Sequence, residues 1–472
     1  MRNLISLWIL LITVSIAAAN EQPNIVFIIA DDLRYDLLHC NGHPRALTPN
    51  IDRLAKEGAN FRQFFATTPL CSPSRASFLT GLYPHSHRVI NNDDQALSVR
   101  SHRLMSFPRV LREEAGYTTA WVGKWHMGFD DSRRPGFDHW ISFRGQGQFI
   151  DPVVNDNGMR RQTRGYLTDL ITDWSVDFLN QNRQRPFCLV VSHEAVHRPF
   201  IPAKRHENLF RDVTVAPVEV NQVALQGKRA LTRKMPATTA PSWFTSADAS
   251  PEPGEPRRGR SDDLQSIVQD QLRCLASVDE GVGRILSALQ SRGILDETIV
   301  IFTSDQGYTS GEFGLKAGKR WPYDPCLRIP FIMRYPPLAK PGSQVDEMVL
   351  NVDLTPTLLS IVGVQWHTPF HGRSFEPILR SGGEPWRQAA LFEYFLEKVT
   401  PRCPRYSAIR TTEWKYIYFP DFPEMDELYD LQTDPDEVWN VVHKRPKIVK
   451  QMRQQLLQLN RDTQNPFAVF SR

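Results

Sequence analysis

Charged and imidazole side chains follow directly after four short apolar runs of this 472-residue chain. The runs and the side chains after them are Ile25–Ala30 with Asp31 and Asp32, Thr118–Val122 with Lys124 and His126, Phe187–Val191 with His193 and His197, and Thr298–Thr303 with Asp305 and Gln306. Ligands of an open parallel sheet bind at the carboxyl ends of its strands. We therefore expect these side chains to meet in one site.

The acidic members of this set point to a hard metal ion. Asp31, Asp32, Asp305 and Gln306 offer only oxygen ligands, which Ca²⁺ and Mg²⁺ prefer. Carboxylates crowded together without a cation would repel one another. For the Asp31-Asp32 pair alone, a turn or a helix cap is the simpler interpretation, but Asp305 at the end of another strand favours a metal.

Basic side chains would surround this metal and give the site a positive potential. The candidates are Arg75, Lys124, His126, His197 and Lys319. One divalent ion with several basic groups suits an anionic ester of sulfate or phosphate. Taken singly, each lysine could be solvated and each histidine could be a hydrogen-bonded structural residue.

The segment Cys71-Ser72-Pro73-Ser74-Arg75 precedes an apolar stretch that predicts a helix. Cys71 should then lie near a helix N-terminus, where backbone N–H groups and the helix dipole favour an anion. A thiolate nucleophile is conceivable in that field. A free reactive thiol is nevertheless poorly suited to an oxidising compartment.

Elements of two kinds must position these residues. The four apolar runs are short and rich in β-branched residues, which is typical of strands buried on both faces. Helical patterns follow Thr48-Pro49 and occupy Tyr166–Leu179 and Asp262–Leu289. This alternation predicts an α/β fold with a large, mixed, mostly parallel sheet between helices.

The sequence pattern of the C-terminal part of the chain differs, because it predicts short strands and turns. The predicted elements there are strands at Leu391–Phe395, Tyr406–Arg410 and Lys415–Tyr418, and a helix within Pro446–Leu459. We predict a catalytic domain at residues 20–370 and a smaller subdomain of antiparallel strands and a helix at residues 371–472. The proline-rich stretch 202–260 predicts long loops, which either form a rim of the active site or extend into solvent.

The first 19 residues predict a secretory signal peptide. Arg2 precedes the apolar run Leu4–Ala19, which ends in small residues and is shorter than the ~20 residues that span a bilayer. We expect export, to a bacterial periplasm or cell surface since no Asn-x-Ser/Thr acceptor occurs, without stable membrane insertion. The net charge of +4 has no concentrated block, which argues against a nucleic-acid partner. Six cysteines without a CxxC pair leave room for one or two disulfides.

Cys71-x-Pro73-Ser74-Arg75 followed by Leu79-Thr80-Gly81 resembles the maturation motif of the type I sulfatases, members of the alkaline phosphatase superfamily. Further motifs of that family occur in order along the chain. They are Pro23-Asn24-Ile25-Val26 with Asp31-Asp32, Thr48-Pro49-Asn50-Ile51-Asp52, Gly123-Lys124-Trp125-His126, Ser304-Asp305-Gln306-Gly307, Lys319-Arg320, Glu427-Leu428-Tyr429-Asp430-Leu431 and Asp434-Pro435. The resemblance implies that a formylglycine-generating enzyme converts Cys71 into Cα-formylglycine.

The resemblance also implies a role for each candidate residue. Asp31, Asp32, Asp305 and Gln306 would hold one Ca²⁺ together with the modified Cys71. Arg75 would hold the formylglycine hydrate, and Lys124, His126, His197 and Lys319 would contact the sulfate. One hydroxyl of the hydrate would attack sulfur while His197, helped by Lys319, protonates the leaving alcohol; the second hydroxyl would then lose its proton to His126 as sulfate is expelled.

Two positions depart from the family pattern. Gln306 stands where the family often has Asn, and its amide oxygen is one methylene farther from the backbone. The residues before His197 also differ from the usual small residue and Pro, so His193 is a local competitor for its role.

For the substrate, the residues 82–87 with Asn91-Asn92, and the segments 393–395 and 408–411, resemble the glycan-directed branch that includes N-acetylglucosamine-6-sulfatases. We expect a sulfated carbohydrate, first of all a 6-O-sulfated N-acetylglucosamine or a related polysaccharide unit. His85, His87, Asn91 and Arg410 are either sugar contacts or ordinary loop residues. The alternatives are a phosphodiesterase or phosphonate monoester hydrolase on the same fold, or a non-catalytic sulfated-glycan binding protein.

Overall fold

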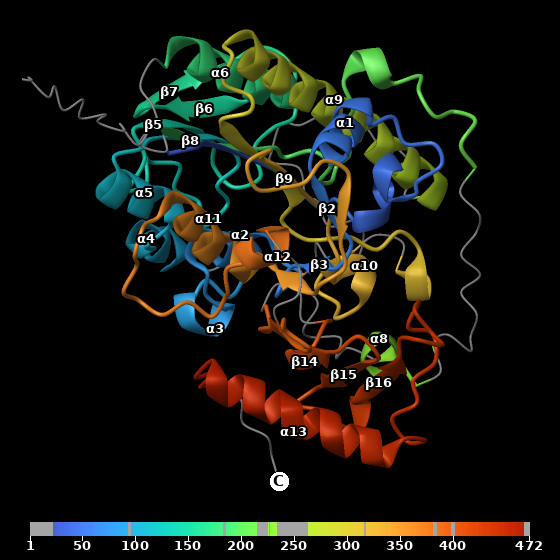
Figure 1. Ribbon diagram of the computed structural model, residues 1–472. Coiled ribbons are helices and arrows are strands. Elements are labelled where there is room, and N and C mark those ends of the chain that lie inside the picture. Colours follow the sequence, from blue (N-terminus) through green and yellow to red (C-terminus); the bar gives the residue numbers. More distant parts are fainter. Residues whose placement is uncertain are drawn as a thin grey trace, which may run out of the picture.

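A mixed sheet forms the centre of the computed structural model, which describes residues 22–92, 96–182, 186–214, 225, 227–233, 263–315, 318–380, 385–397 and 402–466 (Figure 1). Within these residues its strands are β1 (Asn24–Ala30), β2 (Ala59–Phe61), β4 (Thr118–Gly123), β5 (His139–Ser142), β6 (Val153–Asp156), β7 (Met159–Gln162), β8 (Phe187–Ser192), β9 (Thr298–Ser304), β10 (Phe331–Arg334) and β11 (Ser343–Val345). They lie in the order β11-β2-β10-β9-β1-β8-β4-β5-β6-β7. The predicted mixed, mostly parallel α/β sheet is confirmed.

The four predicted strands are neighbours at the middle of this sheet. β1 pairs in parallel with β9 on one side and with β8 on the other, and β8 pairs in parallel with β4. All residues of β1, β8 and β9 are buried, as the runs of β-branched and aromatic residues predicted. The register aligns Ala30 with Ser304 and Ile29 with Ser192, so the strands end at the same edge.

Helices cover both faces of the sheet. The described helices of four or more residues are α1 (Pro49–Glu57), α2 (Cys71–Thr80), α3 (Pro84–His87), α4 (Ala96–Arg103), α5 (Phe107–Ala115), α6 (Leu167–Gln181), α8 (Arg229–Thr232), α9 (Leu264–Ser291), α10 (Asp324–Leu327), α11 (Leu354–Val362), α12 (Glu376–Arg380) and α13 (Pro446–Asp462). Alternate residues of β1 point to opposite faces of the sheet and belong to two different cores. Val26 and Ile28 share a core with α1, α6 and α9, whereas Ile25 and Phe27 share one with α2, α5 and α11.

A second, antiparallel sheet lies towards the C-terminus. Its strands are β13 (Ala390–Tyr394), β14 (Tyr406–Arg410), β15 (Trp414–Tyr418) and β16 (Glu427–Asp430), paired in that order. Helix α13 packs along β13, β14 and β15 (Figure 1). A short parallel pair, β3 (Phe64–Phe65) with β12 (Val349–Leu350), lies apart from both sheets. The boundary between residues 370 and 371 stays a prediction.

Some predictions fall on residues outside this description. The predicted signal peptide, residues 1–19, lies outside the described residues, as does most of the predicted loop region 202–260. Among the described residues, no helix has the length and apolar character needed to cross a membrane.

Candidate active site

Cys71 is the first residue of α2, and its sulfur lies where the central strands end. The side chain is fully buried. Lys319 Nζ lies 2.9 Å from Sγ, Gln306 Nε2 lies 3.4 Å away and Asp31 Oδ1 lies 3.7 Å away. The backbone N–H of Ser72 donates to Asn92 Oδ1 at 3.0 Å, which caps one of the free amides at this end of the helix. Residues from four separate segments therefore surround one sulfur atom.

Arg75, one turn farther along α2, joins three of the strand ends. Its Nη2 donates to Asp31 Oδ2 at 2.7 Å and its Nε donates to Asp305 Oδ2 at 2.9 Å. Its Nη1 donates to Ser192 Oγ at 2.6 Å, at the end of β8. All of these side chains are fully buried. Arg75 therefore fixes the orientation of two carboxylates and neutralises part of their charge.

Lys124 follows β4, and its ammonium group is held from three directions. It lies 2.8 Å from Asp31 Oδ2 and 2.9 Å from Glu194 Oε2, and it also donates to Gln146 Oε1. Lys319 forms a similar bridge, since its Nζ donates to Asp32 Oδ1 at 2.8 Å. Two ammonium groups thus pair with the neighbouring carboxylates Asp31 and Asp32.

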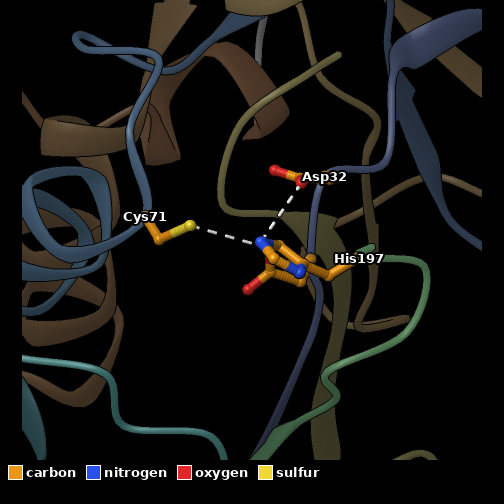
Figure 2. Close-up of side chains that lie close together, drawn as sticks. Asp32, Cys71 and His197 are labelled. Carbon is orange, nitrogen blue, oxygen red and sulfur yellow. Dashed lines mark hydrogen bonds and ion pairs between the residues drawn. The ribbon is translucent and has the colours of Figure 1, made fainter. Parts of the chain in front are cut away.

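His197, from the loop after β8, lies between Cys71 and Asp32 (Figure 2). Its Nε2 is 3.6 Å from Asp32 Oδ2, and its Nδ1 is 2.6 Å from the carbonyl oxygen of Arg198. The competitor His193 is fully buried, and its ring nitrogens have no hydrogen-bond partner among the described residues. The geometry favours His197 over His193 for a role beside Cys71.

His126 is buried, and its Nδ1 has no hydrogen-bond partner among the described residues. Its backbone is held in the left-handed region at φ 53°, and Asp32 adopts φ 58°. Non-glycine residues rarely adopt this conformation, and they do so mostly where the surrounding structure enforces it. The carbonyl oxygen of His126 accepts a hydrogen bond from Ser72 Oγ, which ties the residue to the start of α2.

Burial and neighbouring charges separate the pKa values of the acids. Burial acts against ionisation of Asp31, but Lys124 and Arg75 hold its pKa well below the ordinary value. Burial, together with the charge of Asp31, raises the pKa of Asp305 to about 7. Burial raises the pKa of Glu194 to about 8, while Lys124 acts to lower it. Carboxylates with such different pKa values in one site are typical of functional clusters.

Burial and neighbouring charges also shift the pKa values of the Cys71 thiol and of the two imidazoles. Burial and the charge of Asp31 raise the pKa of the Cys71 thiol to about 12, so an unmodified thiol is protonated at neutral pH. Burial and the charges of Lys124 and Lys319 lower the pKa of His197 to about 4. Burial and Lys124 also lower the pKa of His126, so both imidazoles are neutral near pH 7.

The arrangement of donors fits a hard cation. Asp31, Asp32, Cys71 and His197 each offer a ligand atom, and these atoms lie within 4.8 Å of one another. Asp32 Oδ2 and Gln306 Oε1 are buried without a hydrogen-bond partner among the described residues. Four carboxylates, those of Asp31, Asp32, Glu194 and Asp305, face only three permanently basic side chains. A divalent cation would pair the free oxygens and favour the ionised form of these carboxyl groups.

The structure brings all ten predicted site residues to one place. They are Asp31, Asp32, Cys71, Arg75, Lys124, His126, His197, Asp305, Gln306 and Lys319. Sequence reasoning missed Ser192, Glu194 and Gln146. Glu194 directly follows His193 after a predicted strand, which was an available signal, whereas nothing in the sequence singles out Gln146.

The residues suggested as possible sugar contacts include His85, His87 and Arg410, and all three form contacts within the protein. His85 is buried against Glu393, with its Nδ1 2.9 Å from Oε2, and its Nε2 is 2.9 Å from the carbonyl oxygen of Thr463. His87 Nε2 is 3.1 Å from Ser77 Oγ in the core, and Arg410 pairs with Asp324 at 3.2 Å. His85 and His87 are therefore paired inside the protein, and one guanidinium nitrogen of Arg410 is paired with Asp324. The possible disulfides are also not formed, since all six cysteines are free.

Comparison with known proteins places this geometry in a family. The family model described as Sulfatase matches residues 23–364, and that described as N-sulphoglucosamine sulphohydrolase, C-terminal, matches residues 311–462. The chain is 34% identical to an N-acetylglucosamine-6-O-sulfatase of Bacteroides thetaiotaomicron, over 95% of this chain and 87% of the relative.

Solved structures agree with the family match. A protein in complex with its substrate D-glucosamine-2-N,6-O-disulfate matches with a TM-score of 0.81 at 29% identity, over 95% of this chain and 99% of that one. A phosphonate monoester hydrolase of Agrobacterium radiobacter matches with a TM-score of 0.69 at 23% identity, over 94% and 96%, which is a likeness of fold alone. The chain therefore belongs to the sulfatase family and is a sulfatase enzyme.

Proposed function

We propose that the enzyme hydrolyses sulfate monoesters of carbohydrates, and that its substrate is the 6-O-sulfate of N-acetylglucosamine or of a closely related amino sugar in a glycan. The observation that carries the reaction type is the set of buried oxygen donors and basic side chains around the single sulfur of Cys71. The substrate class rests on the two relatives, one named for N-acetylglucosamine 6-O-sulfate and one that binds a 6-O-sulfated glucosamine.

We propose further that Cys71 is converted to Cα-formylglycine and that one Ca²⁺ is held by Asp31, Asp32, Asp305 and Gln306 with the converted residue. Sulfur is a poor ligand for Ca²⁺, whereas a hydrated aldehyde offers oxygen. Conversion would therefore complete an all-oxygen set of ligands at this point. When present, the two groups supply a hydroxyl nucleophile and a positive charge that stabilises the developing negative charge.

The chain's own residues would then have distinct tasks. Arg75 holds Asp31 and Asp305 in place, because its guanidinium group donates to both carboxylates. Lys319 contacts residue 71 and Lys124 contacts Asp31 beside it, so both ammonium groups can bind the sulfate oxygens. Each can neutralise negative charge as the ester bond breaks.

His197 is the best placed proton donor to the leaving alcohol. Its Nε2 faces the Cys71 side of the site, and a bound sulfate ester would raise its pKa from about 4 because negative charge favours the imidazolium. His126 is neutral and has an unpartnered Nδ1, so it can accept a proton in the second half of the reaction.

Conversion of Cys71 must precede folding. Cys71, Pro73 and Arg75, which form the recognition pattern of the maturation motif, are all buried in the folded protein. A formylglycine-generating enzyme would therefore act on the unfolded chain. Folded protein that carries an unmodified Cys71 should stay unmodified when that enzyme is added later.

The first test is the mass of the peptide that contains Cys71, from protein made in its native host. Conversion removes about 18 Da from that peptide. The same protein should release sulfate from N-acetylglucosamine 6-sulfate, and Cys71→Ala should not. Cys40→Ser is a matched control, since Cys40 lies in the half-buried segment between β1 and α1.

The rival phosphodiesterase or phosphonate monoester hydrolase activity is separated by direct comparison. We expect kcat/KM for the sugar sulfate to exceed that for a phosphonate monoester and a phosphodiester by at least about 10²-fold. A preference for either phosphorus ester would contradict the proposal.

A further inference from the structure

Glu194 is a buried carboxylate to which the proposed mechanism assigns no task. It follows His193 in the loop after β8 and is 1% exposed. Each of its two oxygens lies beside a site residue. Glu194 Oε2 is 2.9 Å from Lys124 Nζ, and Oε1 is 3.3 Å from His197 Nδ1. A buried carboxylate that touches two functional side chains is costly to keep unless it has a role.

The surroundings of His197 determine which ring nitrogen carries the proton. Nδ1 faces two acceptors, the carbonyl oxygen of Arg198 at 2.6 Å and the Glu194 carboxylate at 3.3 Å. The carbonyl oxygen is the nearer of the two and has no proton to give, so Nδ1 is the donor. This leaves Nε2, on the other edge of the ring, facing Asp32 and the Cys71 side of the site. A carboxylate beside Nδ1 also stabilises an imidazolium, as in other acid–base catalysts.

The surroundings of Lys124 give Glu194 a second contact. The ammonium group has three protons and three acceptors, namely Asp31, Glu194 and Gln146. Glu194 is therefore one of three acceptors that hold the ammonium group in place. One rigid carboxylate thus sets the positions of a sulfate-binding lysine and of the candidate proton donor at the same time.

We propose that Glu194 is a positioning residue for sulfate-ester cleavage, which holds the Lys124 ammonium group and orients the His197 imidazole so that Nε2 faces the leaving oxygen. This inference rests on the proposed function above. Glu194 touches no reacting atom, so it acts only through the two side chains that it contacts.

The test compares Glu194→Gln with Glu194→Asp on two sulfate esters. Glutamine keeps the shape and an acceptor for Lys124, but its amide nitrogen offers a second donor to the His197 N–H. We expect kcat for a sugar 6-sulfate to fall by about 10²-fold, the usual range for general acid catalysis. The loss for 4-nitrophenyl sulfate should be less than about tenfold, because that leaving group needs no proton. Glu194→Asp should recover part of the sugar-sulfate activity.

A control variant and a spectroscopic signal separate positioning from general stability. Glu427→Gln removes another fully buried carboxylate, in the C-terminal sheet, and should leave the ratio of the two activities unchanged. In protein labelled with ¹⁵N-histidine, the His197 signals, assigned with His197→Gln, should show a protonated Nδ1 and should change in Glu194→Gln.

Each other outcome has a definite meaning. Equal losses on both esters, or unchanged His197 signals in Glu194→Gln, would overturn the positioning role and leave Glu194 as a structural residue. If the original protein released sulfate and Glu194→Gln released it at the same rate, this inference alone would be overturned. If the original protein released sulfate from neither ester, the proposed function itself would fail, and this inference with it.

Discussion

Two regions of the molecule bury several charged side chains, and their polar atoms are paired to different extents. The active-site cluster, at the ends of β9, β1, β8 and β4, comprises Asp31, Asp32, Arg75, Lys124, Glu194, Asp305 and Lys319. The C-terminal cluster, between α8, α10 and the antiparallel sheet, comprises Lys228, Asp324, Lys415, Glu427 and Glu437.

The C-terminal cluster satisfies its charges within the protein. Lys415 Nζ lies 2.5 Å from both Asp324 Oδ1 and Glu437 Oε1. Lys228 Nζ lies over the rings of Phe313, Tyr323 and Tyr429 at 4.2, 4.5 and 4.1 Å, and it donates to the carbonyl oxygen of Glu437. Such a cluster joins segments that are distant in sequence, and it needs no further ligand.

The active-site cluster leaves atoms unpaired at one point. Asp32 Oδ2, Gln306 Oε1 and His126 Nδ1 are buried without partners among the described residues. Burial of charge therefore does not by itself indicate function, since both clusters have it. Unpaired donors and acceptors around Cys71 are what distinguish the candidate active site.

The largest expected difference comes from removing one carboxylate of the active site. Asp32→Asn keeps an acceptor for Lys319 but removes a charge from the proposed metal ligands. We expect sulfate release to fall by at least about 10³-fold, since this charge helps to hold the metal. The thermal midpoint of the metal-free protein should change little, because Asp32 Oδ2 has no hydrogen bond to lose. If Asp32→Asn kept a near-normal kcat, Asp32 would not be a ligand of the proposed metal.

Removal of metal should affect the same cluster. Treatment with EGTA and dialysis should abolish sulfate release and lower the thermal midpoint, and Ca²⁺ should restore both, because a ligand that binds only the folded state stabilises it. The shift on Ca²⁺ addition should be absent in Asp32→Asn. It should be retained in Lys415→Met, where only the C-terminal cluster is altered. A shift of equal size in Asp32→Asn would contradict the proposed ligand set.

The sequence revealed the active-site cluster more fully than the C-terminal one, for physical reasons. The β-branched runs predicted β1, β4, β8 and β9, and the rule that ligands meet at strand ends grouped the polar residues after these runs into one predicted site. Helix α2 was predicted from an apolar stretch after Cys71, although all ten of its residues are buried and it shows no polar face.

The contacts of Lys124 were harder to predict: Glu194 follows a predicted strand, but the sequence does not show what it contacts, and nothing singles out Gln146. Glu194 and Gln146 are separated from Lys124 by 70 and 22 positions, and only folding brings them to its ammonium group. His85 and His87 illustrate the same limit, because the sequence left open whether they are sugar contacts or ordinary loop residues. In the structure Glu393 and Ser77 take up their ring nitrogens.

The C-terminal cluster should govern stability and leave the chemistry alone. Lys415→Met removes the cation between Asp324 and Glu437, so that Glu437 loses its ammonium partner and Asp324 keeps its ion pair with Arg410. Breaking a buried pair in this way costs about 3 to 5 kcal/mol. We expect a lower midpoint of unfolding in urea, with kcat of the folded enzyme within about twofold of the original. A loss of kcat larger than the loss of folded protein would show that this cluster also supports the active site.

The smallest expected effect is the pH dependence of stability that arises from Asp324. Burial opposes ionisation of Asp324, but Arg410 and Lys415 hold its pKa well below the ordinary value of 3.8. The folded state therefore binds this proton less readily than the unfolded chain. The stabilising contribution is fully present above pH 3.8 and is lost as the pH falls towards the folded pKa.

The free energy of unfolding of the original protein should accordingly exceed that of Asp324→Asn by about 2 kcal/mol near pH 7. This difference should shrink when both proteins are measured in urea at successively lower pH below 3.8. Comparison of the two proteins cancels the titration of carboxylates that do not interact with Asp324, including those of the active site. A difference that stayed constant down to pH 3 would mean that Asp324 contributes through its shape and hydrogen bonds, because a neutral acid would then serve as well as the ion pair with Lys415.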